Sequence, residues 1–202
     1  VDNANPNSYP IWCNFYDSLG AEGIISCGAT ANNNVNIDAV GDVPTACPSD
    51  WLISVTNTTE ADQRSFAGYG ATTIGLGAPG NGILSTCPNA SYNSSRRTSL
   101  ATPHVSGTIG LMISAGCPGF IDAYKQYPDS MALVIIDMLL DNVDPVANLS
   151  GECVTGGRLN LYKAVRAVAD WSCTPIVLNT SQNAANCTNA DGSATVTVTG
   201  NV

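Results

Sequence analysis

The chain has 202 residues, of which 7 are Lys or Arg and 16 are Asp or Glu, so its formal net charge is −9. Such an acidic chain repels phosphate backbones and anionic lipid surfaces, which argues against nucleic acid as a partner. No stretch provides the about 20 apolar residues that a membrane-spanning helix needs. The chain has eight cysteines, none of them in a CxxC pair, and a single histidine, which argues against a zinc site. The cysteines are compatible with disulfides in an oxidising compartment.

The first half of the chain alternates helix-like and strand-like segments. Residues 9–19 predict a short helix, with Pro10 near its start and Gly20 after its end. Three short apolar runs predict buried strands, at residues 23–28, 51–57 and 71–79. Cys27 lies in the first run, either as a buried thiol or in a bridge. Buried strands interleaved with helices predict an α/β protein with a mainly parallel sheet.

Residues 75–80 match the pattern G-x-G-x-x-G, which occurs in phosphate-binding loops. Such a loop has to open a helix whose N-terminal amides face the anion. Here Pro79 lies inside the pattern, and residues 83–84 after it look extended. We therefore interpret the pattern as a tight Gly-Pro surface loop.

Helices dominate the second half of the chain until Trp171. Residues 98–115, 131–140 and 159–168 predict three helices. After Trp171 the helical period ends, and residues 193–200 alternate with a period of two, which predicts a strand. The chain therefore ends in a short β-rich tail.

Ser99 lies in the first turn of the helix predicted at residues 98–115. Backbone N–H groups are unpaired there and the helix dipole is positive, so the serine can present its hydroxyl while its own N–H holds a developing oxyanion. The alternative is an ordinary capping serine. Pro103 fits a helix start, where proline is better tolerated than in the middle of a helix.

His104, the only histidine, is a poor candidate for the base of Ser99. Five helical positions place the two side chains about 140° apart, whereas a base has to reach hydrogen-bond distance. We expect a structural histidine packed beneath the helix. No Ser–His–Asp triad can be completed within the sequence, and a Ser–Lys dyad with Lys125 or Lys163 is only formally possible.

TSLATPHVSG at residues 98–107 resembles the serine box G-T-S-[ML]-A-[TS]-P-H-V-[AS]-G of the subtilisin-like serine proteases, the subtilase or peptidase S8 family. ISCGATAN at 25–32 resembles the strand that ends in A-A-G-N, and residues 53–80 resemble the next strand and the Ala-Pro-Gly loop. Residues 156–160 resemble the closing G-G-R-[LV]-[ND]-[AV] segment. The resemblance implies the C-terminal half of a subtilisin-like domain, with a mainly parallel sheet flanked by helices.

The resemblance implies a serine endopeptidase that cleaves polypeptides through an acyl-enzyme. Ser99 would be the nucleophile. The amide of Asn32, rather than that of Asn33, would complete the oxyanion hole because Asn32 directly follows the strand. Residues Ala29, Thr30 and Ala31 would line the pocket for the substrate residue before the cut.

The resemblance implies no cofactor and assigns no metal site. Structural calcium occurs in many members of the family, but it cannot be placed from this sequence. Asp38, Asp42 and Asp50 are equally well explained as solvated loop carboxylates.

Three departures from the family pattern bear on activity. The aspartate motif and the H-G-T-H histidine motif are absent, so the missing N-terminal part of the domain has to supply both residues, and we expect the chain alone to be inactive. Arg97 stands in place of a glycine and would be strained if that position had a positive φ. Ala31 replaces the glycine before the asparagine. A non-catalytic surface or adhesion protein on a degenerate scaffold therefore stays open as an alternative.

The tail has a resemblance of its own. NCTNADGSATVTVTG at residues 186–200 is similar to the opening of the Ig-like repeats of secreted Bacteroidetes proteins. We therefore predict the C-terminal portion of a subtilisin-like peptidase domain at 1–171, and a linker with the first strands of a β-sandwich at 172–202. This organisation and the uncharged polar surface predict an extracellular or cell-surface protein.

Overall fold

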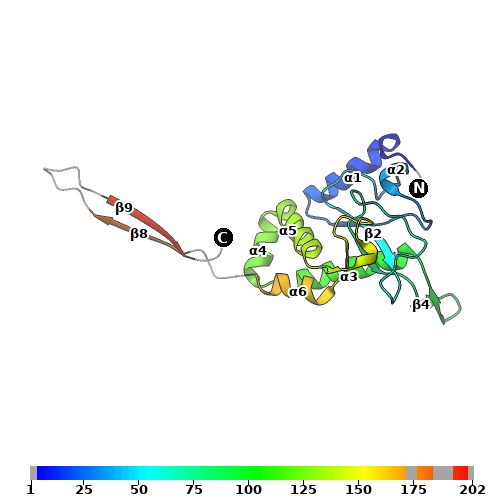
Figure 1. Cartoon of the computed structure of the whole chain (residues 1–202). Helices are drawn as coiled ribbons and strands as arrows, with labels where there is room; N and C mark the ends of the chain where they lie inside the picture. The colour runs from blue at the N-terminus through cyan, green and yellow to red at the C-terminus, as the bar shows by residue number, and fades with distance from the viewer. Residues whose placement is uncertain (1–3, 172–176, 184–192, 200–202) are drawn as a thin grey trace.

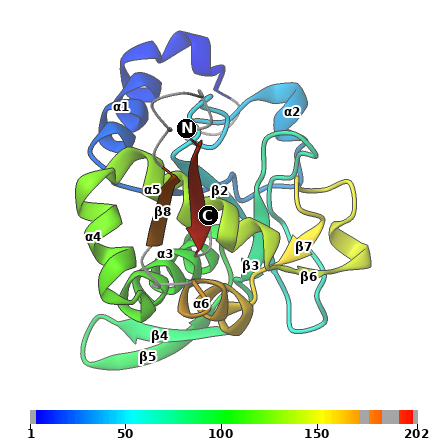
Figure 2. The ribbon, with the colours of Figure 1, turned by 90° about the vertical axis from the view of Figure 1, so that its left-hand side faces the viewer.

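The computed structural model describes residues 4–171, 177–183 and 193–199, and a five-stranded sheet forms its centre (Figure 1). The strands of this sheet are β1 (Ser26–Ala29), β2 (Leu52–Thr58), β3 (Leu76–Pro79), β7 (Gly157–Arg158) and β6 (Asp144–Pro145), in that order across the sheet. β1, β2, β3 and β7 are parallel, and β6 is antiparallel to β7. β6 and β7 lie side by side in Figure 2. The predicted α/β class with a mainly parallel sheet is confirmed.

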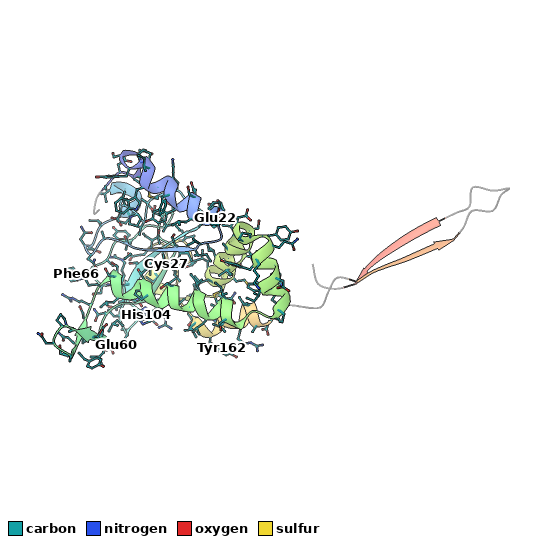
Figure 3. The ribbon with its side chains drawn as sticks, turned by 180° about the vertical axis from the view of Figure 1, so that it is seen from behind. Glu22, Cys27, Glu60, Phe66, His104 and Tyr162 are labelled. Atoms are coloured by element: carbon teal, nitrogen blue, oxygen red, sulfur yellow. A yellow bond between two sulfur atoms is a disulfide. The ribbon has the colours of Figure 1, made fainter. Side chains whose placement is uncertain are left out.

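Helices cover both faces of the sheet (Figures 1 and 3). They are α1 (Pro10–Ala21), α2 (Ile37–Val40), α3 (Thr98–Ala115), α4 (Pro118–Gln126), α5 (Pro128–Asp141) and α6 (Leu161–Ala169), with two 3-10 turns at η1 (Pro6–Ser8) and η2 (Ala147–Leu149). Val55 of β2 packs in the same buried cluster as Val105 of α3. Leu52 of the same strand packs against the buried cluster that includes Cys13 of α1. Alternate residues of β2 therefore face α3 and α1, as the period of a strand requires.

The boundaries of α1 differ from the prediction at its C-terminal end. The helix begins at Pro10, as expected, but it continues through Gly20. A Cβ at Gly20 would lie only 2.1 Å from the ring of Trp51, so a glycine inside the helix is what lets this ring pack. The helix ends before Gly23, whose φ of 77° suits a glycine and whose N–H donates to the carbonyl of Gly20 at 2.8 Å.

The third predicted strand is shorter than expected. Its first residues form a turn held by Asp38, which accepts hydrogen bonds from the N–H of Thr72 at 3.1 Å and the hydroxyl of Thr73 at 2.5 Å. The strand itself begins at Leu76. The interpretation of residues 75–80 as a surface loop is therefore wrong, because most of this segment forms the buried strand β3.

Several elements escaped the sequence analysis. They include the helices α2 and α4 and the two-residue strands β6 and β7. Another is a hairpin of β4 (Ile83–Cys87) and β5 (Ser91–Ser95), of which only the extended start at 83–84 was expected. Asn89 and Ala90 in its turn both have positive φ, 63° and 52°. Such a turn matches the twist of paired strands, and an asparagine tolerates this backbone, which is the signal that could have revealed the hairpin.

The cysteines include both disulfide-bonded residues and free thiols. Cys13 and Cys47 form a disulfide that joins α1 to the loop before β2, across a sequence separation of 34. Cys27 is free and mostly buried, and burial raises the pKa of its thiol to about 12. Of the two alternatives for Cys27, the structure shows the buried thiol.

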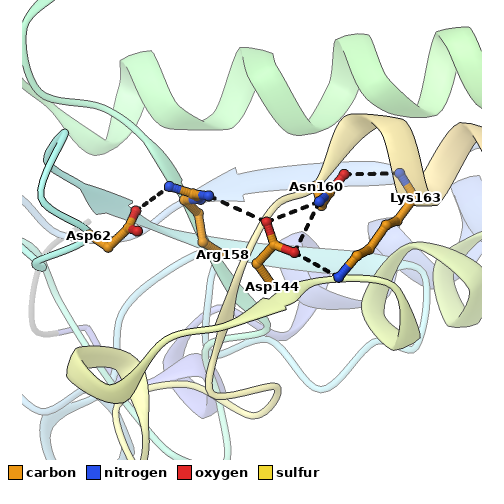
Figure 4. Close-up of polar contacts among 5 residues, drawn as sticks. All are labelled: Asp62, Asp144, Arg158, Asn160 and Lys163. Atoms are coloured by element: carbon orange, nitrogen blue, oxygen red, sulfur yellow. Dashed lines mark hydrogen bonds and ion pairs between the residues drawn. The ribbon is translucent and has the colours of Figure 1, made fainter.

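A polar network joins the edge of the sheet to α6 (Figure 4). The carboxylate of Asp144 accepts hydrogen bonds from Lys163 Nζ at 2.8 Å and from Asn160 Nδ2 at 2.9 and 3.0 Å. Arg158 binds Asp144 at 3.3 Å and also pairs with Asp62. These contacts lower the pKa of Asp144 to about 2, and the hydrogen bonds from Lys163 and Asn160 have the largest effect.

The tail forms a hairpin of its own. β8 (Val177–Asn183) and β9 (Ser193–Thr199) pair in antiparallel fashion, from Val177 opposite Thr199 to Asn183 opposite Ser193. The strand predicted from the period-two pattern is confirmed. Residues 172–176 of the predicted linker, and residues 184–192 and 200–202, lie outside the described part of the chain. Among the described helices, none is by itself long and apolar enough to cross a membrane.

Candidate active site

Ser99 is exposed in the first turn of α3, between side chains that anchor the helix. Thr98 before it and Ala101 after it are completely buried. The helix has the predicted bounds, but Pro103 lies in its second turn rather than at its start. Proline has no N–H, so the carbonyl of Ser99 receives no regular helical hydrogen bond from residue 103.

The start of α3 is fixed at the carboxyl ends of β2 and β3. Arg97, the N-cap residue, donates its N–H to the carbonyl of Gly80 at 2.8 Å. A Cβ at Gly80 would lie 2.6 Å from the Cβ of Asn57 and 2.8 Å from the carbonyl oxygen of Arg97. Glycine at position 80 therefore permits this close approach. In parallel sheets, the carboxyl ends of the strands are where ligands bind.

Asn32 lies against the residue that precedes Ser99. Its Oδ1 is 3.0 Å from the backbone nitrogen of Thr98 and 3.2 Å from the hydroxyl of Thr98, which is also 2.6 Å from the carbonyl oxygen of Thr30. A backbone N–H is only a donor, so the carboxamide has to face it with its oxygen. The Nδ2 group of Asn32 is left without a partner among the described residues.

Ala29, Thr30 and Ala31 lead from β1 to Asn32. Ala29 is half-buried, whereas Thr30 and Ala31 are each only 2% exposed. The hydroxyl of Thr30 has no hydrogen-bond partner among the described residues, and a Cβ at Gly68 would lie 2.4 Å from it. What Thr30 and Ala31 can offer a ligand is therefore mainly their backbone.

A cavity of about 290 Å³ opens beside Asn32. It is lined by Asn32, Asn57, Ser65, Phe66, Ser95, Arg96 and Arg97. The Arg96 guanidinium lies 5.3 Å from the centre of the ring of Phe66, a residue labelled in Figure 3. The sequence analysis did not identify this cavity, because its walls come from four separate segments of the chain.

The strain expected at Arg97 is absent. Its φ of −170° and ψ of 157° describe extended backbone that any residue adopts. An arginine in place of the glycine therefore carries no conformational cost here, and its side chain contributes to the wall of the cavity.

His104 lies on the exposed side of α3 (Figure 3), so its predicted burial beneath the helix is wrong. Its Nδ1 lies 2.9 Å from the carbonyl oxygen of Leu100, one helical turn earlier. Neither lysine considered for a dyad contacts the serine: Lys163 binds Asp144, and Lys125 lies 3.9 Å from Asp122 on α4.

The carboxylates considered for calcium have separate structural contacts. Asp38 holds the turn at residues 72–73, Asp42 is buried and accepts the hydroxyl of Thr45 at 2.5 Å, and Asp50 is exposed. Within the described ranges, no three side chains of the kinds that bind metals gather into one group.

Comparisons with known proteins agree on one family. The model of the subtilase family matches residues 4–126. Thermitase of Thermoactinomyces vulgaris is 34% identical over 56% of this chain and 36% of its own length. Subtilisin-like protease 7 of Arthroderma gypseum is 32% identical over 64% of this chain and 30% of its own. The extracellular basic protease of Dichelobacter nodosus is 40% identical over 48% of this chain and 16% of its own. The chain thus spans about a third or less of these relatives.

Solved structures share the fold. A structure reported for the assembly of subtilase cytotoxin SubAB superposes with a TM-score of 0.66 at 19% identity, over 84% of this chain and 56% of that one. The prenylagaramide maturation protease PagA gives a TM-score of 0.60 at 24% identity, over 75% of this chain and 53% of that one. At these identities the likeness concerns the architecture, and it confirms the predicted subtilisin-like arrangement.

Proposed function

Because the chain belongs to the subtilase family, we propose that it forms the C-terminal part of a serine endopeptidase domain and supplies its nucleophile and one oxyanion donor. The observation that carries this proposal is the contact between the Asn32 carboxamide and Thr98, directly before the exposed Ser99. Sixty-six residues separate Asn32 from Thr98 in the sequence, and the fold brings them together.

In the proposed reaction, the Ser99 hydroxyl attacks the carbonyl carbon of a peptide bond while a histidine from outside this chain accepts its proton. The N–H of Ser99 and the Nδ2 of Asn32 hold the negative oxygen of the tetrahedral intermediate. The contact with Thr98 fixes the carboxamide before the substrate arrives, which is what makes such a donor effective. The proton then passes to the leaving amine, and water hydrolyses the acyl-enzyme. No step requires a cofactor.

The substrate residue before the cut would lie along Ala29, Thr30 and Ala31. Since Thr30 and Ala31 are buried, their backbone rather than their side chains would form this wall. Side-chain specificity at this position would then depend on groups outside the chain.

The open edge of β1 is the proposed attachment site for the segment that carries the aspartate and the histidine. Ser26 and Thr30 donate their N–H groups toward β2, at 2.9 Å to Trp51 and 3.2 Å to Val55. The alternation of a strand turns the amides of Cys27 and Ala29 to the other edge, where no described strand pairs. Exposed apolar side chains are also available on nearby helices: Ile11 and Phe15 on α1, and Leu111 on α3.

We further propose an extracellular or cell-surface location, with the β8–β9 hairpin as the start of a β-sandwich repeat. The Cys13–Cys47 disulfide requires an oxidising compartment to persist. One relative carries the name extracellular basic protease. The antiparallel pairing of β8 with β9 is the kind expected in such a sandwich.

The test is labelling of the full-length protein that contains this chain with a fluorophosphonate, which reacts with activated serines. We expect the wild type and Ser106→Ala to be labelled and to hydrolyse a protein substrate, and Ser99→Ala to do neither. Ser106 is the matched control because it is an exposed serine on the same helix. A folded full-length protein that takes no label would instead support the non-catalytic scaffold.

A further inference from the structure

We propose that Arg96 and Arg97 form a carboxylate-binding subsite on the leaving-group side of the scissile bond, so that peptides with Asp or Glu there are preferred substrates. This inference rests on the proposed function, because it treats the cavity beside Asn32 as part of the substrate cleft. It adds a substrate class that depends on this chain's own side chains.

The first argument is the distribution of charge. The sequence has seven Lys and Arg residues, and five of them pair with carboxylates. The pairs are Arg64–Glu152, Lys125–Asp122, Arg158 with Asp62 and Asp144, Lys163–Asp144 and Arg166–Asp170. Arg96 and Arg97 pair with no carboxylate in the part of the chain that the structure describes. In a molecule with 16 acidic residues, two adjacent cations that none of the described carboxylates neutralises favour an external anion.

The second argument is geometry, because both arginines line the same cavity of about 290 Å³. The stacking of Arg96 on Phe66 restrains its guanidinium over the aromatic face. The backbone of Arg97 is held by Gly80 at 2.8 Å. A guanidinium presents its N–H groups in a planar fork that matches the two oxygens of a carboxylate. The cavity is thus lined by two arginines, one with its guanidinium stacked on Phe66 and one with its backbone fixed, which can both serve one acidic side chain.

The third argument is the position of the cavity relative to the proposed oxyanion donor. Asn32 forms part of its wall, so a bound group would lie next to the scissile carbonyl. The segment 29–31, which would contact the residue before the cut, takes no part in the lining. The cavity therefore lies on the other side of Asn32, where the residues after the cut would bind.

The test compares Glu-containing and Gln-containing peptides that are otherwise identical, at each position on both sides of the cut. It uses the full-length protein, the double variant Arg96→Gln/Arg97→Gln, and the control double variant Lys125→Gln/Arg166→Gln. The control removes the same charge from exposed positions on α4 and α6. Within each protein, the readout is the ratio of kcat/KM for the Glu peptide to that for the Gln peptide.

We expect a ratio of about 10 at one leaving-group position in the wild type and in the control, and a ratio of about 1 in the arginine variant. The preference should also weaken as salt concentration rises, because both guanidinium groups are exposed. A wild-type ratio of 1 at all leaving-group positions overturns the inference. A ratio that survives in the arginine variant, or is lost equally in the control, also overturns it.

Binding separates this inference from the proposed function. The same Glu and Gln peptides are titrated into full-length Ser99→Ala by fluorescence anisotropy, with and without the arginine substitutions. Glu-selective binding that depends on the arginines supports the subsite even if the wild type hydrolyses nothing, in which case only the proposed function fails. Hydrolysis without any Glu selectivity, in turnover or in binding, leaves the proposed function standing and rejects the subsite.

Discussion

Thr98 is the residue that couples the two candidate catalytic groups. It is fully buried, and its backbone N–H and its hydroxyl both face the Oδ1 of Asn32. The next residue, Ser99, is exposed. One buried threonine thus holds the carboxamide of Asn32 and begins the turn that carries the serine.

Replacement of the carboxamide tests this arrangement directly. We expect Asn32→Ala in the full-length protein to lower kcat by about 10²–10³-fold with little change in KM, because the lost hydrogen bond forms mainly in the transition state. Asn33→Ala is the neighbouring control and should retain most of the activity. Steady-state kinetics on one peptide measures both. A larger loss in Asn33→Ala than in Asn32→Ala would reassign the donor.

At the scale of elements, the network around Asp144 ties α6 to the edge of the sheet. Asp144 belongs to β6, Arg158 to β7, Asn160 caps α6, and Lys163 lies in the first turn of that helix. Strands of two residues have few backbone hydrogen bonds of their own. The side-chain contacts in Figure 4 therefore help to hold these short strands in place.

This network predicts a pH-dependent contribution to stability. The pKa of Asp144 is about 2 in the folded protein, below its ordinary value of 3.8. Its ionised form therefore stabilises the fold above about pH 4, and this contribution is lost as the pH falls from about 4 to about 2. The side chains of the network are about a third exposed, so we expect a loss of only about 1 kcal/mol.

The measurement is urea unfolding of the wild type and Asp144→Asn between pH 2 and pH 6. We expect the difference in the free energy of unfolding to be constant above about pH 4 and to shrink below it. Asp170→Asn at the C-cap of α6, which breaks only the surface pair with Arg166, controls for the loss of one charge. A difference that does not change with pH would contradict the lowered pKa.

At the scale of the whole molecule, the dominant feature is a mainly parallel sheet that ends at β1. One edge of β1 pairs with β2, and no strand of the described part of the chain pairs with the other edge. Parallel sheets are normally covered on both faces, and open edges tend to pair with another strand. The edge of β1 is therefore where the proposed remainder of the peptidase domain would join this chain.

Hydrogen exchange of β1 amides tests that assembly. Cys27 and Ala29 direct their amides to the open edge, whereas the amides of Ser26, Gly28 and Thr30 face β2. If another strand pairs there in the full-length protein, we expect all five amides to exchange slowly. Rapid exchange at Cys27 and Ala29, beside slow exchange at the other three, would show that the edge remains open.

Local patterns in the sequence determined the main elements. The small-residue run after Arg97 and the serine box predicted α3 with the bounds that the structure shows, Thr98–Ala115. Apolar runs predicted β2 closely, and the interleaving of strands with helices indicated a parallel sheet. These features were accessible because helix and strand periods depend on residues that are near one another in the chain.

The tertiary structure alone decided which distant residues meet. α1 continues through Gly20, where the absence of a side chain makes room for the ring of Trp51. His104 is exposed because a different face of α3 packs on the sheet. The contact of Asn32 with Thr98 and the cavity lined by Arg96 and Arg97 join segments far apart in the sequence. Such contacts follow from how helices pack on the sheet, which no local pattern encodes. Ser99 and Asn32 could therefore each be singled out as candidates from their own motifs, whereas the contact through Thr98 and the cavity beside them could not.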